Sequence, residues 1–175
     1  MKRNALHQLI TAALLAALTA ALTSIHIVKL PNGGYVHLGD IFVLLAGCLL
    51  PAPYAMAAAA IGGGLADLFT APLWAPATIV IKAAVAGLCS AKRETLLTRR
   101  NALMTLPYAA VTLIGYALHE LLLVALGLEA SEEVWTAILL ASVSLNALQV
   151  LASAALFFAI AAALDRVGFK RKLYL

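Results

Sequence analysis

Polar and ionisable side chains interrupt three long apolar stretches of the sequence at helical spacings. Residues three or four positions apart share one face of a helix. Lys82 lies near the middle of the stretch 75–91, with Thr78 one turn before it. The stretch 103–128 carries Thr112, Tyr116 and Glu120 in steps of four with His119 adjoining, and the stretch 135–164 carries Ser142, Asn146, Gln149 and Ser153. Such stripes can line a site for a small polar molecule.

The depths of these stripes favour a common pocket. A charged side chain at the centre of a bilayer costs roughly 2.5–3.5 kcal/mol, so Lys82 is a candidate functional residue. Counted from the ends of the stretches, Lys82, Tyr116 with Glu120, and Asn146 with Gln149 reach similar levels on three helices. A pocket lined by donors and acceptors is therefore predicted. A structural network, in which Lys82 pairs with Asp67 or Glu120 and no ligand enters, stays open.

Further candidates lie near the predicted outer ends of the helices. Trp74 fits an aromatic belt at the interface or a stacking contact with a flat ligand. The segment 31–37 combines turn-forming residues with an aromatic pair and could fold over the pocket as a lid. Asp40, at the start of a helix, is interpreted as structural. The predicted substrate-binding residues are Lys82, Asn146, Gln149, Glu120, Tyr116, His119, Thr78, Trp74, Tyr35, His37 and Asp67.

Motifs for catalysis or for metal binding are not found. The sequence has no HExxH, GxSxG, Walker lysine loop or aspartate-rich metal motif, and Cys48 and Cys89 are interpreted as core residues. We therefore predict no enzyme activity, no cofactor and no metal, and place any ATPase on another chain. The net charge of +4 comes mostly from three short basic segments, which indicates membrane topology rather than nucleic-acid binding.

The composition predicts the elements that position these residues. Hydrophobic residues make up 64% of the chain, charged residues 11%, and the mean hydropathy is +1.00, which indicates an all-α membrane protein. Pro51 and Pro53 divide the stretch 38–69 into a helical hairpin. The basic segments share one side only if even numbers of spans separate them, so six transmembrane helices with both termini cytoplasmic are predicted. One domain, 1–175, contains helices at about 6–28, 38–50, 54–69, 75–91, 103–128 and 135–164.

Small residues predict close helix contacts. Ala12, Ala16 and Ala20 recur every four residues, and glycines fill positions 62–64. Such a face allows another helix to approach closely. Packing within the fold and docking of a partner membrane protein are both open interpretations.

Four segments, in order along nearly the whole chain, resemble the substrate-binding S components of energy-coupling factor (ECF) vitamin transporters. They run from Gly34 to Asp40 (GYVHLGD), from Gly62 to Leu68 (GGGLADL), from Ala75 to Gly87 (APATIVIKAAVAG) and from Asn146 to Gln149 (NALQ). The resemblance is to the branch that includes riboflavin, pyridoxine and hydroxymethylpyrimidine transporters. It implies a multi-pass subunit of a prokaryotic plasma membrane that captures a vitamin or vitamin precursor from outside, under a lid.

The resemblance also implies partners and residue roles. The ligand-bound subunit would dock on a transmembrane coupling subunit driven by two cytoplasmic ATPase subunits. The family's lysine and Asn-x-x-Gln positions fall on Lys82, Asn146 and Gln149, and its coupling face on Ala12, Ala16 and Ala20. A self-sufficient transporter or channel is the main alternative, and an intramembrane enzyme is a third.

Overall fold

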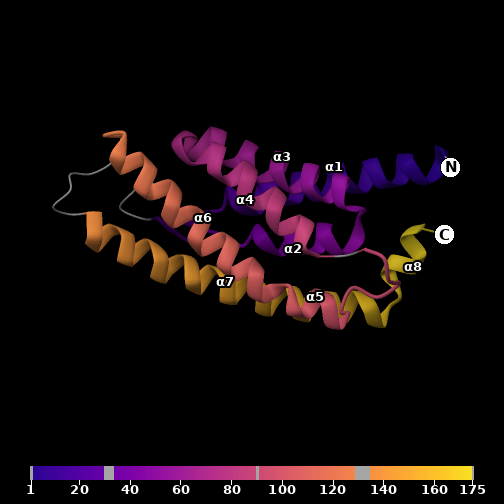
Figure 1. The fold of residues 1–175 in the computed structure, drawn as a ribbon. Coiled ribbons are helices and arrows are strands. Elements are labelled where there is room, and N and C mark those ends of the chain that lie inside the picture. The colour runs from indigo at the N-terminus through magenta and orange to yellow at the C-terminus, as the bar shows by residue number, and fades with distance from the viewer. Residues whose placement is uncertain (1, 30–33, 90, 129–134, 175) are drawn as a thin grey trace.

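The computed structural model describes residues 2–29, 34–89, 91–128 and 135–174, which are mostly helical and include one short hairpin (Figure 1). The helices are α1 (Lys2–Thr23), α2 (Asp40–Leu49), α3 (Ala52–Thr70), α4 (Ala75–Leu88), α5 (Arg99–Leu103), α6 (Thr105–Ala125), α7 (Trp135–Arg166) and α8 (Phe169–Tyr174). A 3-10 turn, η1 (Pro72–Trp74), precedes α4. Strands β1 (Val28–Lys29) and β2 (Tyr35–Val36) pair antiparallel between α1 and α2.

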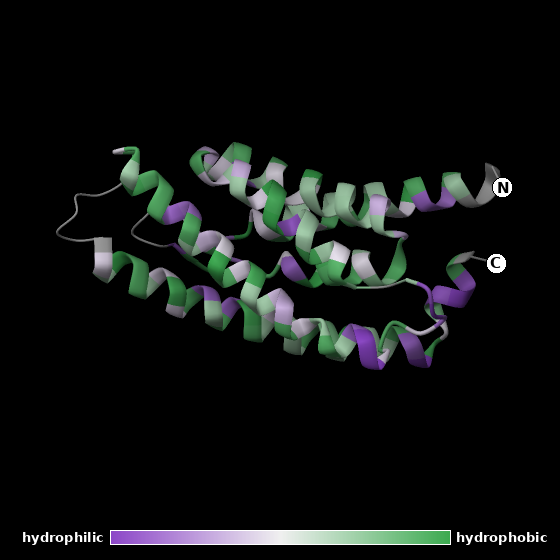
Figure 2. Cartoon of the chain, in the orientation of Figure 1, coloured by the Kyte–Doolittle hydropathy of each residue, from purple (hydrophilic) through white to green (hydrophobic). Residues whose placement is uncertain are grey.

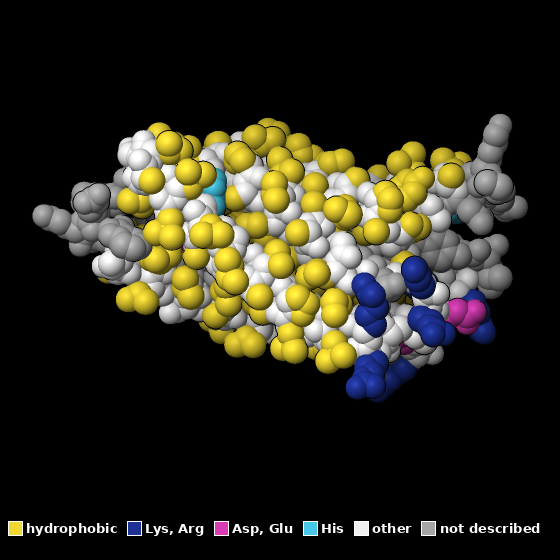
Figure 3. Space-filling model, in the orientation of Figure 1, with side chains coloured by type: hydrophobic (Ala, Val, Ile, Leu, Met, Phe, Trp, Pro, Cys, Tyr) yellow, Lys and Arg dark blue, Asp and Glu magenta, His cyan; other side chains and the backbone are white. Residues whose placement is uncertain are grey.

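Four of the helical segments are long and apolar enough to cross a membrane. They are Ala5–Thr23, Ala52–Thr70, Arg99–Ala125, which joins α5 to α6, and Thr136–Arg166. Two shorter apolar helices, Asp40–Leu49 and Pro72–Leu88, complete the bundle. The outer surface is largely apolar (Figures 2 and 3), as the hydrocarbon of a bilayer requires. The count of six transmembrane helices stays a prediction.

The short helix α2 is the centre of the bundle. All of its residues except Phe42 are buried, and it packs against α1, α3, α4 and α7. A helix that is apolar all round must be surrounded by protein or lipid. Ten residues span only about 15 Å of a hydrocarbon core about 30 Å thick. Neighbouring helices therefore shield α2, which leaves room above its N-terminus for a site.

Prolines set the boundaries around this central helix. Leu50, the residue before Pro51, is extended at φ −108° and ψ 152°, because proline disfavours the helical conformation in the preceding residue. Pro53 then lies in the first turn of α3, where its missing N–H leaves no helical hydrogen bond unmade. Pro72 and Pro76 act in the same way after α3, in η1 and in the first turn of α4.

The predicted helix 6–28 ends earlier, at Thr23. The last apolar residues of that stretch enter strand β1, where Val28 pairs with Val36 and Lys29 with Tyr35. Hydropathy does not separate a helix from a strand over so few residues. The segment that follows α1 therefore starts the lid rather than extending the helix.

Glycines bring α3 into close contact with two neighbours. A Cβ atom on Gly62 would lie 2.5 Å from the carbonyl oxygen of Ala16 in α1. A Cβ on Gly63 would lie 3.0 Å from side-chain atoms of Thr78 and Lys82 in α4. Real Cβ contacts with backbone atoms are longer than 2.5 Å, so Gly62 requires glycine for this packing, whereas a Cβ at Gly63 would need small shifts of the side chains of Thr78 and Lys82. Part of the small-residue pattern therefore serves packing within the fold.

The two ends of the chain lie at one end of the bundle, together with the loop that joins α4 to α5 (Figure 1). Lys and Arg side chains gather at that same end (Figure 3). Basic segments lie on the same side of a membrane when an even number of helices crosses the membrane between them. That this end faces the cytoplasm stays a prediction.

Candidate functional site

A small cavity lies where the lid hairpin meets five other elements. It is lined by Gly34, Tyr35, His37, Asp67, Trp74, Thr78, Tyr116, Asn146 and Gln149, from the lid, α3, η1, α4, α6 and α7. Its volume is about 30 Å³. A cavity of that size holds one or two water molecules, whereas pockets for drug-sized ligands measure about 300–1,000 Å³. The site is therefore closed around its own side chains in this structure.

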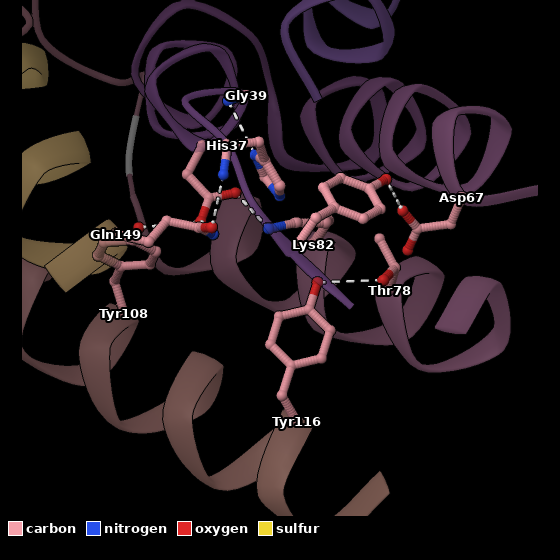
Figure 4. Close-up of polar contacts among 10 residues, drawn as sticks. His37, Gly39, Asp67, Thr78, Lys82, Tyr108, Tyr116 and Gln149 are labelled. Carbon is pink, nitrogen blue, oxygen red and sulfur yellow. Dashed lines mark hydrogen bonds and ion pairs between the residues drawn. The ribbon is translucent and has the colours of Figure 1, made fainter. Parts of the chain in front are cut away.

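Aromatic rings form one wall of the cavity. The rings of Trp74 and Tyr116 lie 5.9 Å apart at an interplanar angle of 57°. The Tyr116 hydroxyl shares a hydrogen bond of 3.0 Å with the Thr78 hydroxyl (Figure 4). The Trp74 ring also meets the edge of His119 at 5.4 Å. Two aromatic faces held by hydrogen bonds and packing are suited to contact a flat ring.

Tyr35 of the lid fills the opposite side of the cavity. Its hydroxyl donates to the carboxylate of Asp67 and accepts a hydrogen bond of 3.0 Å from Thr70. Its ring lies 3.8 Å from the ring of His26. Burial and the nearby carboxylate raise the pKa of Tyr35, so the hydroxyl keeps its proton and remains a donor. Asp67 is the one acidic residue among the described residues that line the cavity, and its carboxylate is bound by the phenol hydroxyl of the lid.

A second polar cluster centres on Asp40 and adjoins the cavity through Gln149, which lines it. Lys82 forms an ion pair with the Asp40 carboxylate, and both side chains are almost fully buried, at 1% and 0% exposed. The same carboxylate accepts from the Tyr108 hydroxyl at 3.0 Å and from the Gln149 amide at 3.3 Å. Three donors thus satisfy one buried carboxylate, which is what burial of a charged pair requires.

Gln149 joins this cluster to the lid. Its amide oxygen accepts a hydrogen bond of 2.9 Å from the backbone N–H of His37, while its amide nitrogen serves Asp40. The ring Nδ1 of His37 accepts from the Gly39 N–H at 3.0 Å. Burial, together with the charge of Lys82, lowers the pKa of His37 to about 3, so the ring is neutral at physiological pH and can accept. Hydrogen bonds of Gln149 therefore join the lid backbone to the network around Asp40.

The predicted site residues divide into two groups. All but Lys82, Glu120 and His119 line the cavity. Glu120 instead accepts a hydrogen bond of 3.2 Å from Ser142 of α7, and Nε2 of His119 donates to the Leu73 carbonyl at 2.8 Å. The residues brought together at the cavity are Asn146, Gln149, Tyr116, Thr78, Trp74, Tyr35, His37 and Asp67.

Lys82 pairs with a residue that the alternative of a structural network did not name. Its ion-pair partner is neither Asp67 nor Glu120 but Asp40, which had been interpreted as a structural residue at a helix start. The reason is that α2 begins deep inside the bundle, where its first carboxylate meets the middle of α4.

Sequence reasoning missed Asp40 and Tyr108 as members of the site. Tyr108 precedes Thr112 by four residues, so the stripe on α6 extends one step further than was predicted. That spacing could have revealed it. Asp40 had no comparable signal, because its partners come from α4, α6 and α7, far away in the sequence.

Part of the predicted lid, residues 31–33, lies outside the described residues. Within the described ranges, no group of three His, Cys, Asp or Glu side chains is placed to hold a metal ion.

Comparison with known proteins supplies the family. The sequence model described as "ECF-type riboflavin transporter, S component" matches residues 3–166, nearly the whole chain. No curated protein matches. The chain therefore belongs to the S components of ECF transporters, multi-pass membrane subunits that bind a vitamin for uptake.

Proposed function

We propose that this chain captures a vitamin or vitamin precursor from outside the cell for an ECF-type importer. The observation that carries the proposal is the cavity beneath the lid, in which two aromatic rings face a carboxylate and two amide side chains. A ring-shaped ligand with polar edges needs these groups. The six-helix topology with cytoplasmic termini would open this cavity to the outside, since it lies away from the basic end.

The lining groups favour a ligand with hydrogen-bond donors. The carboxylate of Asp67 accepts a hydrogen bond from the Tyr35 hydroxyl, and a ligand hydroxyl or amino group can take the place of that phenol as the donor. Asn146 can read a donor and an acceptor on a ring edge. Pyridoxine, a pyrimidine precursor and a riboflavin-like compound each present donors and acceptors at ring edges, and the lining groups can serve any of them.

Binding in this proposal requires the lid to move. Tyr35 leaves Asp67 as the ligand enters, and the tie between the His37 N–H and Gln149 then re-forms over the bound molecule. Lys82 acts from below by holding Asp40, which in turn orients Gln149. Its role is to position the amide rather than to contact the ligand.

A groove on α1 and α3 supports docking of a transmembrane coupling subunit. It has a volume of about 390 Å³ and is lined only by apolar and small residues and the ring of Tyr54. Ala12, Ala16 and Ala20 line it beside the exposed Ala13 and Ala17. In a membrane, small residues let helix backbones approach closely. We propose that two cytoplasmic ATPase subunits drive the complex through this coupling subunit.

Filling the groove should separate assembly from ligand binding. Ala17→Trp places a large ring in the groove, and we expect co-purification with the coupling subunit to fall by about tenfold or more because the helices can no longer approach. Ligand binding should be unchanged, since Ala17 lies outside the cavity. The matched control is Leu14→Trp, on the same helix, 59% exposed and outside the groove. Equal loss of assembly in both variants would contradict the proposed docking face.

Equilibrium binding to the purified chain tests the proposed function. A panel of B vitamins and pyrimidine precursors should contain one compound that binds without nucleotide or any other subunit. Chain reconstituted alone into vesicles should not accumulate that compound. Accumulation by the chain alone would favour the self-sufficient transporter instead.

A further inference from the structure

A second and larger hollow lies at the basic end of the bundle, far from the lid. Its volume is about 880 Å³, and it opens between the start of α3, the end of α4 and α5. One side is apolar or small, formed by Pro51, Ala52, Gly87, Cys89 and Ala91. The other side carries four basic residues of one short segment, Lys92, Arg93, Arg99 and Arg100.

The rim of the hollow is held in place by buried polar contacts. Both carboxylate oxygens of Asp165 accept backbone N–H groups, those of Leu96 at 2.7 Å and Leu97 at 2.9 Å. Lys170 donates to the carbonyl oxygens of Cys48 and Ala91, each at 2.7 Å. The loop that bears the basic side chains is therefore built onto α7 and α8. Basic residues that only set the orientation of the chain in the membrane need to lie on the correct side of it. They do not need a loop that is fixed in place by such contacts.

In the described part of the chain, the carboxylates near the hollow do not pair with Arg93 or Arg99. Asp165 is engaged by the backbone, and Glu94 is exposed and does not line the hollow. Arg93 and Arg99 form no ion pair within the described part of the chain. Arg100 donates to the Leu88 carbonyl at 3.3 Å, which positions it at the end of α4. The guanidinium groups in the hollow can therefore donate hydrogen bonds to an anionic oxygen.

The apolar side of the hollow continues onto the surface that faces lipid. Met56 lies beside Gly87, its sulfur 3.4 Å from where a Cβ on that glycine would be, and is 39% exposed. A ligand here would meet positive charge at one end and an apolar face at the other. An acyl chain attached to a phosphate has that pattern, and basic pockets between membrane helices bind anionic head groups.

We propose that this hollow binds the phosphate of an anionic phospholipid, with the acyl chain along the face that includes Met56. The test uses the full chain, delipidated in detergent, with phosphatidylglycerol added and bound lipid counted by native mass spectrometry. Arg93→Gln with Arg99→Gln removes two charges from the hollow. We expect about 25-fold weaker binding, since each basic residue near an anionic lipid contributes roughly fivefold.

The matched control removes two charges from the same end of the chain without touching the hollow. Arg171→Gln with Lys172→Gln, both exposed on α8, should keep phosphatidylglycerol binding unchanged. The proposal would be overturned if the control variant lost as much phosphatidylglycerol binding as the test variant. It would also be overturned if the unsubstituted chain retained phosphatidylcholine as well as phosphatidylglycerol. Displacement of the lipid by inorganic phosphate would overturn it too, since that would indicate a free-anion site. Unchanged lipid binding with lost assembly onto the ATPase subunits would identify a protein interface instead. Thermal unfolding checks that both variants fold.

Discussion

Lys82→Met is expected to lower the thermal unfolding temperature of the detergent-purified chain by about 6–20 °C. The substitution leaves Asp40 fully buried without its counter-charge. Removing one partner of a buried ion pair costs about 3–5 kcal/mol, and each kcal/mol shifts the midpoint by roughly 2–4 °C in a chain of this size. Thermal unfolding followed by circular dichroism measures the change. Lys172→Met, at an exposed position of α8, is the control and should leave the midpoint unchanged.

A double variant distinguishes the ion pair from simple loss of packing. Asp40→Asn combined with Lys82→Met removes both charges and keeps an oxygen to accept from Tyr108 and Gln149. We expect it to recover most of the loss, because no uncompensated charge remains. If the two losses simply add in the double variant, the pair does not stabilise the site as the structure indicates.

Trp74→Ala should weaken binding of the tightest panel compound by about 5- to 150-fold. The ring forms the aromatic wall with Tyr116, and stacking of a heteroaromatic ring on such a side chain contributes about 1–3 kcal/mol. Trp74→Phe retains a smaller ring and should lose less. Titration monitored by calorimetry gives the affinities.

Phe69→Ala is the matched control for that substitution. Phe69 is 84% exposed at the end of α3 and does not line the cavity, so its removal should not change the affinity. Equal weakening by Trp74→Ala and Phe69→Ala would show that the aromatic wall does not contact the ligand.

The polar stripes could be predicted from the sequence because helical geometry alone determines them. On α7, Ser142, Asn146, Gln149 and Ser153 are all buried, so they share the inward face that their spacing indicates. The same holds for Thr112, Tyr116 and Glu120 on α6. Periodicity gives the face of a helix but not the neighbour that the face meets. Glu120 is buried accordingly, yet it meets Ser142 and not the cavity.

The pairing of Lys82 with Asp40 could not be predicted in the same way. It depends on α2 being enclosed by α1, α3, α4 and α7, which places its first residue inside the bundle. The apolar stretch 38–50 is equally consistent with a span at the lipid surface, because hydropathy reports apolar character and not what surrounds it. The length of the stretch was the one available sign, since its thirteen residues are fewer than the roughly 20 that a span usually needs.

The position of the lid could be predicted from the sequence, but its contacts could not. Turn-forming residues and two aromatic side chains predicted a covering loop, and the structure places Tyr35 and His37 at the cavity. The hydrogen bond between Tyr35 and Asp67 joins residues 32 positions apart and has no spacing signal. This hydrogen bond is the reason that the proposed ligand carries a donor group for Asp67.

Native mass spectrometry of the chain purified from its cells tests vitamin capture most directly. We predict that a fraction of the protein carries one small heteroaromatic molecule with hydroxyl or amino donors, and that Asp67→Asn and Trp74→Ala both reduce this fraction. The bound mass identifies the compound, which should then rebind to stripped protein without nucleotide. Absence of any co-purified molecule, together with no binding across the panel of B vitamins and pyrimidine precursors, would contradict a vitamin-binding site in this cavity.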